Sequence, residues 1–224
     1  MPKPIEPMKR LILSAILASS LFGAAAHADS YEDALSSARR GDTPQLMQLI
    51  SRGVDPNTVD AQGNSLLILA AREGNLDTVK ELLKHRPKVS LRNAAGDSAL
   101  MVAVLKGETT IVDILLAAGA EVNHDGWTPL MYAAFEGRTE IVDRLLARGV
   151  DVGALAPNGS SPLMLAARNG HIDVVRRLLK TGADLDQKND AGFTAESWAL
   201  DNGNTDIAGL LRAERSRRQA AGAR

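Results

Sequence analysis

The sequence predicts an all-α solenoid of helix–turn–helix units, with a β-hairpin-like turn projecting between successive units. Two glycine patterns predict it. A short motif recurs at intervals of 33, 30, 33 and 33 residues, and its copies start at Gly63, Gly96, Gly126, Gly159 and Gly192. A second glycine closes each copy, at Gly41, Gly74, Gly107, Gly137, Gly170 and Gly203. Self-similarity at this period indicates a stack of supersecondary units.

The first helix of each unit is delimited by residues that favour helix ends. Two residues after the first glycine stands a Ser or Thr, which can cap a helix N-terminus: Ser65, Ser98, Thr128, Ser161 and Thr194. Pro129 and Pro162 follow at the first helical position, where a missing N–H is tolerated. The closing glycine suits the left-handed conformation that often ends a helix. These features predict a short first helix in each unit.

The second helix of each unit carries an apolar stripe at helical spacing. In one unit the stripe comprises Ile141, Val142, Leu145 and Leu146. Helices of about ten residues are marginal alone, so the neighbouring units must supply their stability. Paired alanines such as Ala133 and Ala134 let adjacent first helices approach closely.

The motif Gly126-Trp127-Thr128-Pro129-Leu130 resembles the signature of the ankyrin-repeat family, and Ser161-Pro162-Leu163 is a second good match. The resemblance covers roughly residues 31 to 212. It implies a non-catalytic scaffold that holds a protein partner on a concave surface formed by the turns and the first helices. It also implies that His171, directly after a closing glycine, is structural.

The repeat register divides the chain into an array over residues 29–212 and a basic tail over 213–224. The expected units are 29–60, an N-terminal cap, then 61–93, 94–123, 124–156, 157–189, and 190–212, a C-terminal cap. Terminal units need a polar outer face to stay soluble. Arg212, Arg215, Arg217, Arg218 and Arg224 make the end basic. We expect a frayed, solvated helix end there, and a docking tail for an acidic surface is the alternative.

Residues 1–28 have the composition of a cleavable secretory signal peptide. Lys3, Lys9 and Arg10 precede an apolar run from Leu11, which ends in Ala26-His27-Ala28. The run is short for a membrane span and contains several serines. We expect cleavage after Ala28 and a bacterial periplasmic protein without stable membrane insertion, secretion being the alternative. The chain has no cysteine, so it forms no disulfide in an oxidising compartment.

Charge and motif content argue against several function classes. The chain has 26 basic and 27 acidic residues, a balance that does not favour a nucleic-acid partner. His85, His124 and His171 fall at three different positions of three units, so they do not converge on a metal. No nucleophile–base arrangement and no phosphate-binding loop is evident. We therefore expect no enzyme activity, no metal and no cofactor, and a monomer.

Two departures from the family pattern leave alternatives open. Methionines stand where the family usually has a histidine, at Met101, Met131 and Met164, which we interpret as packing rather than a copper or haem stripe. The turn over residues 119–126 is three residues shorter than its counterparts. It is either a neutral loop deletion or a notch beside Trp127 and Phe135 that fits a partner.

The register also selects candidate binding residues on the concave side. They follow the first glycine or precede the closing glycine, and aromatic and arginine side chains are favoured as anchors. The candidates are Arg72, Trp127, Phe135, Glu136, Arg168, Asn169 and Phe193.

We expect an unidentified protein partner for this surface, with a role in envelope or oxidative-stress protection. A periplasmic immunity protein that caps a toxin is the alternative. A metal-binding protein or enzyme is disfavoured.

Overall fold

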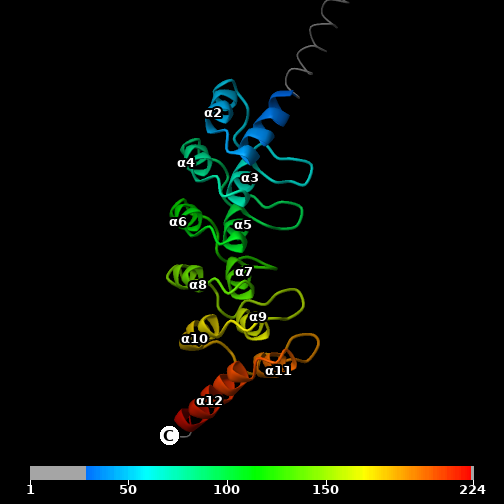
Figure 1. Cartoon of the computed structure of the whole chain (residues 1–224), viewed down its shortest axis with the longest axis vertical. Coiled ribbons are helices and arrows are strands. Elements are labelled where there is room, and N and C mark those ends of the chain that lie inside the picture. Colours follow the sequence, from blue (N-terminus) through cyan, green and yellow to red (C-terminus); the bar gives the residue numbers. More distant parts are fainter. Residues whose placement is uncertain (1–28, 223–224) are drawn as a thin grey trace, which may run out of the picture.

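The computed structural model describes residues 29–222, and the predicted signal peptide lies outside them. Within the described part, the chain is helical apart from turns and two isolated β-bridges. The helices stack in two columns along one long axis (Figure 1). The prediction of an all-α solenoid with projecting turns is confirmed.

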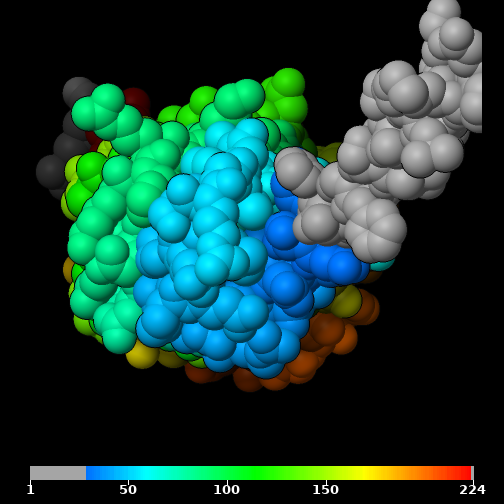
Figure 2. Space-filling model, turned by 90° about the horizontal axis from the view of Figure 1, so that it is seen from above, coloured from blue at the N-terminus to red at the C-terminus, as the bar shows by residue number. Residues whose placement is uncertain are grey.

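Each unit contributes one helix to an inner column and one to an outer column. The inner column begins with helical residues 29–40 and continues with α3 (Leu66–Arg72), α5 (Ala99–Lys106), α7 (Pro129–Phe135), α9 (Pro162–Arg168) and α11 (Ala195–Asp201). The outer column comprises α2 (Thr43–Ser51), α4 (Leu76–Lys84), α6 (Thr109–Ala117), α8 (Thr139–Leu146), α10 (Ile172–Lys180) and α12 (Thr205–Gly222). Figure 2 looks along the long axis, where the first unit hides much of the stack behind it.

The inner helices from α3 onward begin at the predicted caps. In each case the Ser or Thr oxygen accepts a hydrogen bond from the backbone N–H three residues later, as Thr128 does from Met131 at 3.3 Å. The other capping residues are Ser65, Ser98, Ser161 and Thr194. Pro129 and Pro162 occupy the start of their helices, as predicted. Local sequence therefore fixes where each inner helix starts.

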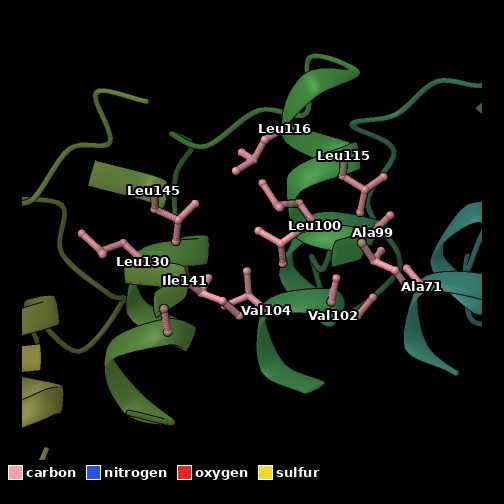
Figure 3. Close-up of a cluster of buried hydrophobic side chains, with 14 of the residues drawn as sticks. Ala71, Ala99, Leu100, Val102, Val104, Leu115, Leu116, Leu130, Ile141 and Leu145 are labelled. Atoms are coloured by element: carbon pink, nitrogen blue, oxygen red, sulfur yellow. The ribbon is translucent and has the colours of Figure 1, made fainter. Parts of the chain in front are cut away.

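One continuous apolar core runs between the two columns. Leu100, Leu115, Leu130 and Leu145 are fully buried and pack between α5, α6, α7 and α8 (Figure 3). The paired alanines of the inner helices are likewise fully buried, so small side chains let these helices pack closely. Met101, Met131 and Met164 are at most 1% exposed and fill the interior, in keeping with the packing interpretation.

The closing glycines have positive φ. All but Gly203 are contacted by the side chain that directly follows the closing glycine of the next unit. Gly137 has φ +69°, and a Cβ atom added there would lie 2.5 Å from Nδ1 of His171. Nε2 of His171 donates a 2.9 Å hydrogen bond to the carbonyl of Phe135, at the end of α7. His171 therefore closes the helix of the preceding unit, which is the structural role expected for it.

Four of the projecting turns share one pair of backbone hydrogen bonds. In the turn before α5, Asn93 donates to Asp97 O at 3.0 Å and Gly96 to Asn93 O at 2.9 Å. The turns before α3, α9 and α11 repeat this pattern. Among the described residues, the shortened turn before α7 makes neither bond, and Figure 1 shows it reaching less far than its neighbours.

The C-terminal helix differs from the expected frayed end, because α12 continues to Gly222 and is attached to the preceding unit. Arg218 donates to the carbonyls of Ala183 (2.8 Å) and Leu179 (3.1 Å). Arg215 donates to Glu196 and to Leu185 O. Burial alone would raise the pKa of Glu196, but hydrogen bonds from Arg212 and Arg215 outweigh burial and lower it. Long guanidinium side chains thus attach the C-terminal half of α12 to the preceding unit.

The link between Gly137 and His171 yields a stability prediction. Replacing Gly137 with Ala strains a left-handed residue and displaces the His171 ring, so we expect unfolding free energy to fall by about 2–3 kcal/mol. Gly149→Ala is the matched control, because Gly149 has φ +71° and open space around its Cβ position. Gly149→Ala should lower the unfolding free energy by only about 1–2 kcal/mol. Equal losses for both variants in urea unfolding would contradict the packing role of His171.

Candidate protein-binding surface

The inner helices and the turns that precede them form one side of the array (Figure 1). Trp127, Phe135, Arg168 and Phe193 lie on this side, at the C-terminal half of the stack, whereas Arg72 lies on α3 in the other half. The structure therefore separates the predicted residues into two groups with different surroundings.

An aromatic cluster stands at the start of α7. The ring centroids of Trp127 and Tyr132 are 5.1 Å apart, and those of Trp127 and Phe135 are 6.0 Å apart in an edge-on arrangement. Both separations are in the range of favourable aromatic contacts. All three rings are only partly buried, so each keeps a solvent-accessible edge or face.

A small hydrophobic cluster, separate from the main core, supports the rings of Trp127 and Phe135, whereas Tyr132 packs against the main core. The buried members of the small cluster are Met131, Ala156 and Leu165, and Trp127, Phe135, Ala154 and Trp198 pack on it as partly buried members. The cluster spans α7, the turn before α9, α9 itself and α11. It therefore forms an apolar surface shared by three consecutive units.

Arg168 and Phe193 extend this surface towards the C-terminus. The guanidinium carbon of Arg168 lies 4.8 Å from the ring centroid of Trp198, which is a cation–π distance. The ring of Phe193 stacks on that of Trp198, with their centroids 6.0 Å apart. We call Trp127, Phe135, Arg168, Phe193 and Trp198 the aromatic patch.

Three other predicted residues are engaged within the protein. Asn169 donates its side-chain amide to the carbonyl of Phe135 at 2.8 Å. Arg72 donates to the side-chain oxygen of Asn64 at 2.7 Å. Glu136 is partly buried, and its carboxylate lies 4.0 Å from the guanidinium of Arg138. The side chains of Asn169 and Arg72 thus stabilise contacts within the array. A binding role for Asn169, Arg72 and Glu136 stays a prediction.

The N-terminal half of the same side carries a polar network instead of aromatic rings. The side-chain oxygen of Asn64 accepts from Arg72 and, at 2.8 Å, from the amide of Asn93. Asn93 accepts from the backbone N–H of Asp97, and Asp97 accepts from the Tyr132 hydroxyl at 2.8 Å. The network therefore reaches the aromatic cluster and joins the two halves.

Sequence reasoning missed Trp198 and Tyr132. Both stand four residues after a helix-capping residue, at a position that Leu69, Val102 and Leu165 occupy in the other units. In a helix this position is one turn before the position of Phe135 and Arg168, so it faces the same side. Comparing this position across the units could have identified both residues.

The shortened turn lies next to the aromatic cluster, because Trp127 follows it directly. Within this turn His124 donates from Nδ1 to the carbonyl of Asp125 at 3.0 Å, and its Nε2 is buried with no partner in the described structure. Asn123 accepts from the backbone N–H of Asp151 at 2.8 Å. The turn is thus anchored to the next one by a side chain.

Residues 29–222 hold neither a metal-ligating cluster nor a membrane-spanning helix. This part of the chain contains no group of three or more His, Cys, Asp or Glu side chains suited to a metal ion. None of its helices combines the length and apolar composition that crossing a bilayer requires. His85, His124 and His171 fall on different units, as their register predicts.

Tyr132 gives a pH-dependent prediction. Burial and the neighbouring Asp97 carboxylate raise the pKa of the Tyr132 phenol above its usual value of about 10. The unfolded chain therefore ionises first, so this contribution to stability is full below about pH 10 and is lost as the pH rises beyond it. We expect Tyr132→Phe to make the loss of melting temperature above pH 10 shallower, with Tyr31→Phe as control. An equal loss of melting temperature above pH 10 in both variants would contradict this role of Tyr132.

Two solved structures share this architecture. The ankyrin repeat domain of human ASB11 superposes with a TM-score of 0.73 and 27% sequence identity, covering 81% of this chain and 82% of that chain. The second match is a chain in the complex of the predatory endopeptidase Bd0816 from Bdellovibrio bacteriovorus with the immunity protein Bd3460. It has a TM-score of 0.72 and 31% identity, covering 81% of this chain and 97% of that chain.

Sequence comparisons point the same way. A stretch of 85 residues is 40% identical to part of the glycerophosphocholine phosphodiesterase gde1 of Schizosaccharomyces pombe. It makes up 36% of this chain but only 8% of that relative, so the chain spans a small fraction of its length. The family described as Ankyrin repeats (3 copies) matches residues 35–125, 87–156 and 130–219. Since these matches together span residues 35–219, well over half of the chain, the protein belongs to the ankyrin-repeat family.

Proposed function

We propose that this protein is an exported, non-catalytic scaffold that binds a protein partner through the aromatic patch. The observation that carries the proposal is the position of that patch. Trp127, Phe135 and Trp198 rest on a hydrophobic cluster outside the main core, and Arg168 covers one of the rings. Tryptophan and arginine side chains contribute most to binding energy at protein interfaces. Rings held by a rigid support lose little conformational entropy when a partner covers them.

Export is supported by residues 1–28, whose basic start, apolar run and Ala-His-Ala end match a secretory signal. We place the protein in the bacterial periplasm, with secretion as the alternative, and assign it to envelope or oxidative-stress protection. The absence of cysteine suits an oxidising compartment, where the array needs no disulfide.

A specific comparison favours a second candidate function. The chain aligned with this protein over 97% of its length belongs to a complex of an endopeptidase with an immunity protein, at 31% identity. An immunity protein that caps a toxin or a hydrolytic enzyme would use the same aromatic patch, because it also needs a rigid surface for a folded partner. The two candidates differ in what the partner does, not in where it binds.

Export has a direct test. In the source bacterium, the protein in the periplasmic fraction should have the mass of residues 29–224, because cleavage follows Ala28. The Ala26→Arg, Ala28→Arg variant should retain residues 1–28, since small residues at these positions define the cleavage site. Cytoplasmic protein that keeps residues 1–28 would refute export.

The binding surface is tested by capture of a partner from a periplasmic extract, followed by measurement of its affinity. We expect Arg168→Ala and Trp198→Ala each to weaken binding by about tenfold or more, as at interface hot spots. Lys80→Ala on α4 is the control, because its side chain is exposed on the outer column.

Equal binding by all variants would move the site away from the aromatic patch, provided that their melting temperatures match. A captured toxin or hydrolase, inhibited by the protein but not by Trp198→Ala, would establish the immunity function. A captured partner whose activity persists in the complex would favour the scaffold function.

A further inference from the structure

Three outer helices, α6, α8 and α10, are connected by a ladder of two arginine–aspartate pairs. Arg144 on α8 binds Asp113 on α6, and Arg177 on α10 binds Asp143 on α8, each at 2.7 Å. Asp113, Asp143 and Arg176 occupy the same position in their respective helices. Each step of the ladder therefore needs an acid at this position and an arginine from the next helix.

The ladder stops between α10 and α12 because both partners are replaced. Arg176 stands where the acid should be, and Leu210 of α12 stands at the position of Arg144 and Arg177. A groove of about 470 Å³ opens here, and Arg176, Arg177, Leu179, Lys180, Leu210, Glu214 and Arg217 line it. This volume is within the range of ligand-binding clefts.

The groove has more positive charges than internal partners for them. Within residues 29–222, Arg176 and Lys180 make no ion pair within 4.0 Å, and Asp173, one turn before Arg176, makes none either. Arg177 is already paired with Asp143. The one carboxylate lining the groove, Glu214, is held by Arg217 and Arg218 at 2.7 and 2.8 Å. These hydrogen bonds lower the pKa of Glu214 to about 2, so it stays ionised within that cluster.

The corresponding face of α4 shows how such charges are neutralised elsewhere in the array. Lys80 and Lys84 occupy the positions of Arg176 and Lys180. They pair with Asp77 at 3.9 Å and with Glu81 at 2.6 Å on their own helix. At the position of Glu81, α10 has Arg177. The cationic groove is thus particular to α10 rather than a general property of the units.

We propose that the groove between α10 and α12 binds an acidic segment of a protein partner. Carboxylates of the segment would pair with Arg176 and Lys180, and an apolar side chain between them would rest on Leu179 and Leu210, which are both partly exposed. The apolar strip between the cations favours a peptide over a polyphosphate or a nucleic acid, which needs a longer basic surface. The groove is on the outer column, so it is separate from the aromatic patch.

The test uses the purified protein and a fluorescein-labelled peptide of alternating glutamate and leucine, with anisotropy as the readout. We expect binding that weakens as NaCl is raised, because exposed charges are screened. The double variant Arg176→Ser, Lys180→Ser should bind the peptide about fivefold to tenfold more weakly. Lys80→Ser, Lys84→Ser removes the same charge from the equivalent positions of α4 and should change the affinity by less than about twofold.

Three outcomes would overturn the proposal. The first is an equal loss of peptide affinity in the two double variants, which would show that the peptide responds to the net charge of the protein rather than to the groove. The second is failure of the peptide to bind at low salt. The third is binding of inorganic pyrophosphate or single-stranded DNA more tightly than the peptide, with the same sensitivity to Arg176→Ser, Lys180→Ser. Since none of these variants touches the aromatic patch, failure here leaves the proposed function intact.

Discussion

The structure depends on hydrogen bonds by which most units close the inner helix of the unit before them. A helix of seven or eight residues leaves most of its terminal carbonyls without partners. Here the next unit supplies them: Asn75 donates to the carbonyls of Ala38 and Arg39, and Asn204 to those of Ala167 and Arg168. Arg138 and His171 do the same for α5 and α7. No unit is complete alone, so order propagates along the stack.

This mutual closure explains how exposed aromatic side chains are kept available for binding. The main core is sealed between the two columns, and the closing contacts lie at the ends of the inner helices. The rings of Trp127 and Phe135 take part in neither task, whereas the Trp198 ring packs on both the main core and a second, smaller cluster. Trp127 and Phe135 are therefore free to cover that smaller cluster, formed by Met131, Ala156 and Leu165, while they stay partly exposed. The proposed binding surface and most of the contacts that hold the stack together thus lie on different faces of the same helices.

Much of the fold could be predicted from the sequence because the repeated features are local. A capping Ser or Thr, a proline at the first helical position and a closing glycine each act within a few residues, and each lies where its register places it. The candidate site could be predicted only in part. The register identified Trp127, Phe135, Arg168 and Phe193, but Trp198 gains its importance from packing across three units. No local pattern expresses such a contact. The same holds for α12, where arginines attach the helix by bonds to carbonyls 30 to 39 residues earlier.

The shortened turn before α7 also bears on the mechanics of the array. Backbone bonds tie neighbouring turns together at both ends of the row, from Ala94 to Gln62 and from Asp190 to Asn158. In the middle the connections are side chains, Arg92 to Asp125 and Asn123 to Asp151. Turns joined by backbone hydrogen bonds resist bending, whereas turns joined only by flexible side chains move apart more easily. The backbone ties thus define two groups of turns, and the unit of α7 lies between them, with Trp127 and Phe135 of the aromatic patch on it. Bending between the α7 unit and its neighbours would therefore change the spacing within the aromatic patch before it disturbed the turns tied by backbone hydrogen bonds.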